Sequence, residues 1–219
     1  MIIEFHNHVH LPEWAKRPYW QGKCPMVIEN VLRVNEEAGV DLVVISNPLH
    51  ELKGKDRAYQ LQIVKDLNRC FAEMQDKHAG KLVALAGAVA GGGDEFLKET
   101  ERAIKVDGLK GAMITSSVNG GYPDDDEAMP FFKMMTDLDV PVMMHPPTVA
   151  FGEERMMDYR LASSVGRPFD NSLALSRLIV RGIFEKFPTL KLVGTHLGGG
   201  ISEMIGRLDY AYELQEEAY

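Results

Sequence analysis

Four of the seven histidines lie where their side chains could hold one metal ion. His6 and His8 are two residues apart near the N-terminus, and His145 and His196 each end an apolar run. Side chains two apart on a strand point to the same side, so we expect His6 and His8 to face together and Asn7 to face away. Two imidazole nitrogens placed in this way can reach one ion at about 2.0–2.1 Å. The spacing therefore predicts a metal site that starts on the first strand.

The two later histidines occupy equivalent positions in the chain. His145 ends the apolar segment Val140–His145, and His196 ends Leu190–His196 just before a run of three glycines. In parallel α/β folds the carboxyl ends of the strands carry the functional groups. A lone histidine at a strand end is usually a hydrogen-bonded structural residue, and an HxH pair often occurs by chance. The prediction of a metal site depends on the combination of all four.

Strand-like and helix-like segments alternate along the chain that must position these histidines. Strands are expected at Met1–Phe5 with the HxH pair, Asp41–Ser46, Lys81–Val89, Leu109–Thr115, Val140–His145 and Leu190–His196. Helices are expected at Pro25–Ala38, Asp56–His78, Asp94–Val106, Asp126–Leu138, Asn171–Phe187 and Ile201–Glu217, with a longer connection at Phe151–Asp170. Six strand–helix units in this order predict a parallel sheet in a single α/β domain, residues 1–219.

The composition of the chain indicates which classes of binding partner and which cellular compartment to expect. A net charge of −8 and a pI of about 5.4 argue against a general nucleic-acid binder. The longest apolar run, Leu82–Ala90, has the length of a strand and is too short to span a membrane. Cys24 and Cys70 form no CxxC pair, and the polar N-terminus does not look like an export signal. We therefore expect a cytoplasmic protein with reduced thiols and a small-molecule substrate.

Two stretches around the histidines resemble a known family. Ile3–His8 resembles the HxH opening of the amidohydrolase superfamily. Gly182–Gly200 is similar to the amidohydrolase-related (amidohydrolase 2) branch, which includes aminocarboxymuconate-semialdehyde decarboxylase and related aromatic-acid decarboxylases. Gly108–Thr115 and Pro146-Pro147 extend the resemblance along most of the chain. The resemblance implies a TIM-like (β/α)8 barrel with one divalent metal ion at the carboxyl mouth of the strands, with only the first six units present here.

The resemblance also implies a role for each candidate residue. His6, His8 and His145 would be metal ligands, and His196 would be the catalytic acid or base beside the metal. The ion is expected to be zinc, although imidazole also serves Mn²⁺ and Co²⁺. Arg207 matches a family arginine that reaches into the neighbouring subunit of a homodimer to hold a substrate carboxylate. The alternative for Arg207 is an ordinary arginine on the surface of a helix.

Further substrate contacts are expected from residues on predicted connections. Trp14 follows the first strand and could stack on an unsaturated substrate, or simply pack within its loop. The cations Arg17, Lys23, Arg155 and Arg167 are additional candidates for binding a carboxylate, with no order among them.

One departure from the family concerns the end of the chain. The family places an aspartate ligand at the end of the eighth strand, whereas this sequence ends at Tyr219, after the sixth unit. We therefore expect a fragment, or a natural chain that continues, with the first and sixth strands left as open edges.

Two chemistries and one inert alternative fit this set of residues. The resemblance favours non-oxidative decarboxylation of a small carboxylated unsaturated or aromatic substrate. The alternative is a metal-dependent hydrolase of a lactone or amide, in which hydroxide attacks the carbonyl carbon. An inactive, incomplete barrel that serves as a binding or scaffold subunit is the third possibility. The signatures of other enzyme classes, such as GxSxG, GxxxxGK[ST] or GxGxxG after a strand, are missing from the sequence.

Overall fold

The computed structural model describes residues 1–16, 26–147 and 152–214. Every ladder between neighbouring strands is parallel, in the orders β1-β2-β3 and β4-β5-β6-β7. The strands are β1 (Ile3–His8), β2 (Leu42–Ser46), β3 (Leu82–Ala84), β4 (Ala86–Gly87), β5 (Ala112–Thr115), β6 (Val142–His145) and β7 (Leu192–Gly194). The predicted α/β organisation with parallel strands is therefore confirmed.

The two sheets are continuous in hydrogen bonding around Leu85, which separates β3 from β4. The Leu85 amide donates to the Ile45 carbonyl at 3.0 Å, and the Lys110 amide donates to the Ala84 carbonyl at 2.9 Å. The segment predicted as one strand at Lys81–Val89 thus forms two short strands, because it pairs with β2 first and with β5 afterwards. Together with the other strands it makes one curved surface.

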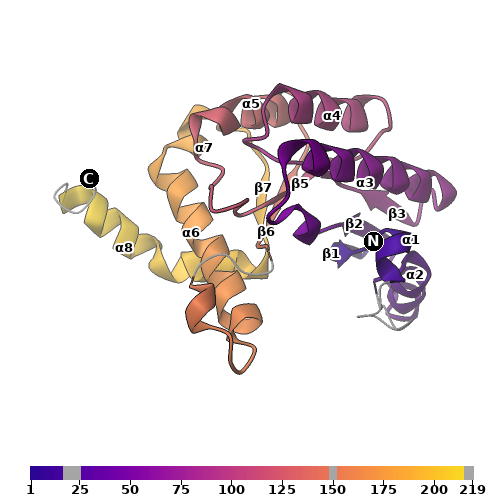
Figure 1. Ribbon diagram of the computed structural model, residues 1–219, viewed down its shortest axis with the longest axis horizontal. Coiled ribbons are helices and arrows are strands. Elements are labelled where there is room, and N and C mark those ends of the chain that lie inside the picture. Colours follow the sequence, from indigo (N-terminus) through magenta and orange to yellow (C-terminus); the bar gives the residue numbers. More distant parts are fainter. Residues whose placement is uncertain (17–25, 148–151, 215–219) are drawn as a thin grey trace.

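Helices follow the strands, and all but the first and the last lie on the outer side of this surface (Figure 1). They are α1 (Pro12–Ala15), α2 (Ile28–Glu37), α3 (Arg57–Lys77), α4 (Asp94–Lys105), α5 (Met129–Asp137), α6 (Arg167–Val180), α7 (Ile183–Lys186) and α8 (Ile201–Leu214). Single turns at η1 (His50–Leu52), η2 (Asp126–Ala128), η3 (Glu153–Arg155) and η5 (His196–Gly200) and a π-helical turn at η4 (Ala162–Gly166) complete the described elements.

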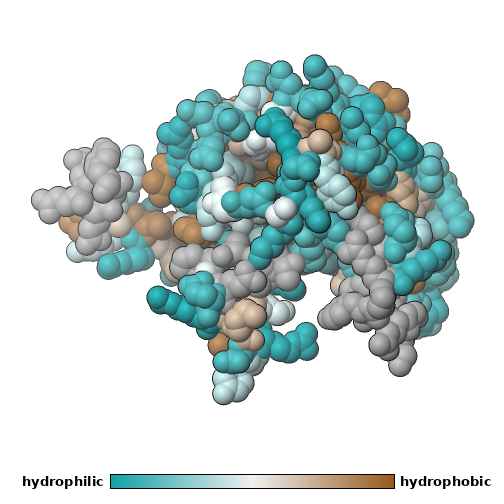
Figure 2. Space-filling view, in the orientation of Figure 1, coloured by the Kyte–Doolittle hydropathy of each residue, from teal (hydrophilic) through white to brown (hydrophobic). Residues whose placement is uncertain are grey.

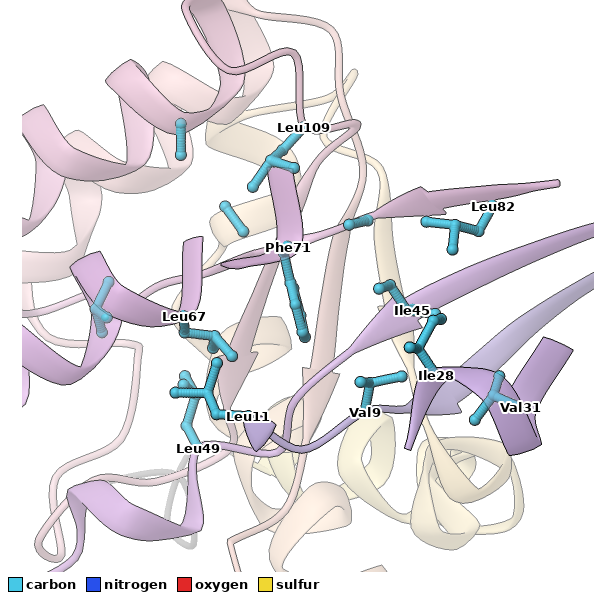
Figure 3. Close-up of a cluster of buried hydrophobic side chains, with 14 of the residues drawn as sticks. Val9, Leu11, Ile28, Val31, Ile45, Leu49, Leu67, Phe71, Leu82 and Leu109 are labelled. Carbon is cyan, nitrogen blue, oxygen red and sulfur yellow. The ribbon is translucent and has the colours of Figure 1, made fainter. Parts of the chain in front are cut away.

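Apolar side chains fill both sides of the curved sheet. One outer cluster packs α2 and α3 against β2 and β3, and Phe71 lies at its centre, surrounded by the residues labelled in Figure 3. A second outer cluster packs α5 and α6 against β5 and β6. The inner cluster draws almost wholly on strand residues: Val44, Leu85, Met113 and Met143, with Phe5 and Val83 against them. Its composition places it on the concave side of the sheet, below the ends of the strands.

The region after β6 differs most from the prediction. α6 begins at Arg167 and not at Asn171, which a proline at the second helical position, Pro168, could have indicated. The expected single helix to Phe187 is interrupted after Val180, because Gly182 has a left-handed φ of 73° and starts α7. β7 ends at Gly194, two residues before the predicted end of this strand.

The two outermost strands and the last helix are exposed. Among the described strands, β1 and β7 are each paired on one side only, and Ile3 and Val193 are 45% and 37% exposed there. α8 has no buried residue and extends away from the other elements (Figure 1). Figure 2 shows apolar surface in the region where α8 projects from the other helices and strands, whereas the outer faces of α3 and α4 are mainly hydrophilic. None of the described helices is both long enough and apolar enough to span a membrane.

A buried carboxylate ties α6 to the segment that follows β5. Asp170 is fully buried and accepts hydrogen bonds from the hydroxyls of Ser116, Ser117 (3.1 Å) and Tyr122 (2.9 Å). A buried charge without partners would be strongly unfavourable, so these three donors stabilise both the carboxylate and the docking of the helix. The beginning of α6 is thereby fixed against the strand ends.

We predict that Asp170→Ala lowers the free energy of unfolding by about 2–4 kcal/mol, because it leaves three hydroxyls without their acceptor. Asp126→Ala is the matched control, since that carboxylate is 87% exposed and pairs only with Arg181 at the surface. Its effect should be below about 0.5 kcal/mol. Urea denaturation measures both, and equal losses would contradict the role given to Asp170.

Candidate metal centre

Four imidazole rings from three strand ends converge at the carboxyl end of the sheet. Nε2 of His8 lies 3.1 Å from Nε2 of His6 and 3.1 Å from Nε2 of His145. One nitrogen from each of His6, His145 and His196 lies within 4.8 Å of the other two. The expectation that His6 and His8 point together is confirmed, and the rings of His145 and His196 join them at centroid distances of 4.6–5.4 Å.

The parity of the strands explains why these rings meet. On β6, His145 shares a face with Met143 of the inner cluster, so its ring lies directly above that cluster. On β1 the pairing with β2 shifts register between Glu4 and Asn7. Such an irregularity re-aims side chains, and here Phe5 packs in the inner cluster while His6 and His8 face the other rings.

Hydrogen bonds behind two of the rings fix which nitrogen carries the proton. Nδ1 of His145 lies 2.8 Å from the Pro146 carbonyl, which can only accept, so Nδ1 is the protonated nitrogen. Nδ1 of His8 lies 3.0 Å from the Ser46 hydroxyl, and Ser46 uses its own proton to donate to the Asn7 carbonyl at 3.0 Å. Both rings therefore turn an unprotonated Nε2 toward the centre.

This arrangement fits a cation. The Nε2 lone pairs of His8 and His145 face each other at 3.1 Å, and neither ring has a proton left to place between them. Two lone pairs at that distance repel each other unless a positive charge lies close to both. Neutral imidazoles that donate their other nitrogen to a carbonyl or hydroxyl are the usual ligands of Zn²⁺ and of other divalent transition metals. The donor set of His6, His8 and His145 is thus suited to such an ion.

Burial keeps the rings neutral. Loss of solvent, reinforced by His6 and by the other rings nearby, lowers the pKa of His8 to about 3. Desolvation and the neighbouring His8 lower the pKa of His145 to about 2, although its bond to the Pro146 carbonyl acts in the opposite direction. Burial also lowers the pKa of His6, opposed by the charge of Glu4. At neutral pH the lone pairs are therefore available to a metal ion.

His196 is held in a different way. It lies in the turn η5 after β7 with a left-handed φ of 52°, and Leu197, Gly198 and Gly199 continue that conformation. A Cβ at Gly199 would meet the Pro168 carbonyl oxygen, so only glycine fits this position. The Ser172 hydroxyl on α6 donates to the Gly199 carbonyl at 2.5 Å. α6 thus determines where the His196 ring lies.

Besides Ser46, sequence reasoning missed three residues that border the centre. His50 on η1 brings its ring to 6.4 Å from that of His145, and burial, Arg167 and His10 lower its pKa to about 4. The position of His50 shortly after the second strand could have indicated that it lies near the carboxyl ends of the strands. Asn171 and Thr195 lie directly behind His196 and are buried. Their proximity depends on how α6 packs, which no local pattern reveals.

The expected substrate contacts are not all in one place. Arg207 is exposed on α8, the helix that extends away from the other elements, and its guanidinium lies 5.6 Å from the Tyr210 ring. Trp14 lies on α1, but its side chain is outside the described part of the chain, as are Arg17 and Lys23. Arg155 is 86% exposed on its side chain. Arg167 is close enough to the centre for its charge to lower the pKa of His196, after the larger effects of burial and His6.

Comparison with known proteins gives a family match. A family model described as "Amidohydrolase" matches residues 4–218. The 2-amino-3-carboxymuconate-6-semialdehyde decarboxylase of Dictyostelium discoideum is 29% identical over 157 residues, which are 72% of this chain and 44% of that protein. The chain thus spans less than half the length of this relative. The resemblance inferred from the sequence motifs is confirmed.

Solved structures show the same fold. A 2,6-dihydroxybenzoate decarboxylase complexed with 2,6-dihydroxybenzoate superimposes with a TM-score of 0.85 at 20% identity, over 98% of this chain and 72% of that one. The 5-carboxyvanillate decarboxylase of Novosphingobium aromaticivorans, complexed with manganese and 4-hydroxy-3-methoxy-5-nitrobenzoic acid, gives 0.85 at 19% identity, over 98% and 70% of the two chains. The expected TIM-like barrel fold is confirmed.

We predict that His145→Ala lowers the affinity for Zn²⁺ and Mn²⁺ by more than about 100-fold, because it removes one of the three candidate imidazole ligands. Ser46→Ala, which removes only the partner of His8 Nδ1, should cost about 10-fold. His78→Gln is the control, since His78 ends α3 at the opposite edge of the sheet. Isothermal titration calorimetry gives the affinities, and unchanged binding in His145→Ala would contradict the site.

The metal-free protein should lose stability in mild acid. Between pH 6.5 and about 4 the unfolded chain binds protons on His8 and His145 that the folded chain excludes, because the folded pKa values are about 3 and about 2. The free energy of unfolding therefore falls with falling pH, by up to about 1.4 kcal/mol per pH unit for each ring. Denaturation with a chelator present, at about pH 7, 6 and 5, measures the slope. His8→Gln should flatten it, and an identical slope in that variant would disprove this origin.

Proposed function

The chain belongs to the amidohydrolase family, and from that premise we propose that it is a metal-dependent carboxy-lyase. The substrate would be a small carboxylated aromatic or unsaturated molecule, and the reaction a decarboxylation without a redox cofactor. The observation that carries the proposal is the set of neutral imidazoles whose lone pairs face one point at the carboxyl end of the sheet. The relative and the two solved structures named above, all decarboxylases, support it.

Each residue of the centre has a proposed part. His6, His8 and His145 would hold one divalent cation, with Ser46 and the Pro146 carbonyl keeping two of the rings in the ligating tautomer. When bound, such a cation supplies a positive charge and Lewis acidity that orient substrate oxygens and stabilise negative charge on them. His196 would hold or move a proton beside the three ligands.

The carboxylate of the substrate needs a cationic partner. Arg167 is the cation supported best, because it acts on the pKa of both His50 and His196 and so must lie near the rings. Arg207 would contribute from the other subunit of a homodimer, a role compatible with its exposed position on α8. Trp14 would stack on the unsaturated part of the substrate.

The proposed reaction is balanced without an oxidant. The bond between the carboxylate carbon and its neighbour breaks, CO₂ leaves, and a proton takes the place of the carboxylate on the same carbon. One proton is consumed, and no electrons leave the substrate. The centre must therefore bind an anion, keep bulk water from the reacting carbon and supply one proton.

Metal identity, assembly and location complete the proposal. Zn²⁺, Mn²⁺ or Co²⁺ would suit an imidazole site, and the manganese named for one neighbour supports Mn²⁺ as a candidate beside the expected zinc. A homodimer is supported by the apolar surface along α8, which includes Met204, Ile205 and Tyr210. The cytoplasm is proposed from the interpretation of the two cysteines as reduced thiols.

We predict that the protein loaded with Zn²⁺ or Mn²⁺ releases CO₂ from at least one member of a panel of substrates. The panel contains hydroxybenzoates and unsaturated carboxylic acids with an amino or hydroxy substituent. CO₂ and the protonated product should appear in equal amounts, followed by mass spectrometry and NMR. A chelator or His145→Ala should reduce the rate by more than about 1,000-fold, whereas His78→Gln should retain it.

The same assay separates the alternatives. Hydrolysis of a lactone or amide panel without release of CO₂ would overturn the carboxy-lyase in favour of a hydrolase. Tight metal binding with no turnover of any panel would favour a binding or scaffold subunit.

A further inference from the structure

The hydrogen bonds behind His196 are opposite in kind to those behind His8 and His145. Nδ1 of His196 lies 3.1 Å from the Thr195 hydroxyl and 3.4 Å from the Asn171 amide nitrogen. The same amide nitrogen donates to the Thr195 carbonyl at 2.9 Å and to the Thr195 hydroxyl at 3.1 Å. Nδ1 of His196 thus faces two groups that can donate a hydrogen bond, whereas Nδ1 of His145 faces a carbonyl oxygen, which can only accept one.

The orientation of the Asn171 amide is determined by the Thr195 carbonyl. A carbonyl oxygen can only accept, so the NH₂ end of Asn171, and not its oxygen, must face it. Asn171 is fully buried on α6, and water cannot take over either bond. Both protons of the amide are therefore directed at the group formed by Thr195 and His196.

A count of the available protons and acceptors then determines the tautomer of the His196 ring. The Asn171 amide and the Thr195 hydroxyl together offer three protons, and the Thr195 carbonyl, the Thr195 hydroxyl oxygen and His196 Nδ1 are three acceptors. All are satisfied only if Nδ1 carries no proton. A proton on Nδ1 would leave the Thr195 hydroxyl without an acceptor among its described contacts, in a residue that is only 5% exposed.

We propose that Asn171 and Thr195 are positioning residues that hold neutral His196 as its Nε2–H tautomer. His196 then faces the candidate metal centre as a hydrogen-bond donor and not as a further ligand. Ser46 behind His8 is the contrasting case in the same chain, because its proton goes to the Asn7 carbonyl and its oxygen is left to accept from the ring. Where the hydroxyl proton goes thus decides the tautomer of the ring. The Ser46 hydroxyl accepts from Nδ1 of His8 and leaves its Nε2 free to bind a metal ion, whereas the Thr195 hydroxyl donates to Nδ1 of His196 and leaves its Nε2 as a hydrogen-bond donor.

The consequence for the reaction rests on the proposed function. An N–H directed into the centre would bind a substrate oxygen, either of the carboxylate or of a neighbouring ring hydroxyl, and would orient the anion against the three ligating rings. α6 contributes this through consecutive residues: Asp170 fixes the helix to the segment after β5, Asn171 sets the tautomer, and Ser172 holds the turn that carries His196.

Long-range ¹H–¹⁵N NMR of the histidine rings tests the proposal without any activity measurement. In the metal-free protein we expect Nε2–H for His196 and Nδ1–H for His8 and His145. One equivalent of Zn²⁺ should shift the Nε2 signals of His8 and His145 and leave His196 as Nε2–H. An Nδ1–H signal from His196, or a zinc-induced shift of its Nε2 like that of His145, would overturn the proposal.

Three variants show whether Asn171 and Thr195 are responsible. Asn171→Asp replaces the donor by an acceptor of the same shape and should convert His196 to Nδ1–H. Thr195→Val removes the hydroxyl and should leave a mixture of tautomers, whereas Thr195→Ser should restore Nε2–H. The His145 signals serve as the internal control for folding and should stay unchanged. An unaltered Nε2–H tautomer in both Asn171→Asp and Thr195→Val would refute the role of these residues.

The outcome is independent of the carboxy-lyase assay. If the tautomers are as expected but no CO₂ is released, the proposed function fails and the tautomer assignment stands. If CO₂ is released while His196 is Nδ1–H, the function stands and this inference fails.

Discussion

Two imidazole nitrogens face each other at 3.1 Å with no proton between them, and this contact between His8 and His145 constrains everything around it. The Ser46 hydroxyl and the Pro146 carbonyl prevent either ring from turning a proton inward. Two lone pairs directed at each other in this way suit a cation placed close to both. Burial of the two rings lowers their pKa values, so the lone pairs are free at neutral pH.

The fold supplies this arrangement from distant parts of the chain. His8 and His145 are 137 residues apart, and they meet because the carboxyl ends of parallel strands lie at one edge of the sheet. The inner cluster below them fills the concave side, so the rings lie above a solid apolar base. α6 then determines the fourth ring from outside, through buried polar residues at its beginning. The sheet determines where the rings of His6, His8 and His145 lie, and α6 determines where the ring of His196 lies.

The parts that the sequence predicts are those set by local periodicity. Alternation by two placed His6 and His8 on one side, and the buried runs before His145 and His196 indicated strand ends. The parts it did not predict depend on long-range packing: the division of one predicted strand at Leu85, the early start of α6 at Arg167 and the break at Gly182. The same limit applies within the centre. Ser46, Asn171 and Thr195 are unremarkable in sequence, and their effect on the tautomers appears only when the hydrogen bonds are counted across the fold.

X-ray absorption at the zinc edge, on the full chain with one equivalent of Zn²⁺, tests the central claim most directly. The geometry predicts three imidazole nitrogens at about 2.0–2.1 Å, with the multiple-scattering pattern of histidine rings. Loss of one such ring in His145→Ala should leave two. A zinc ion surrounded only by oxygen atoms, or an unchanged number of imidazoles in that variant, would contradict the claim that these rings form the metal site.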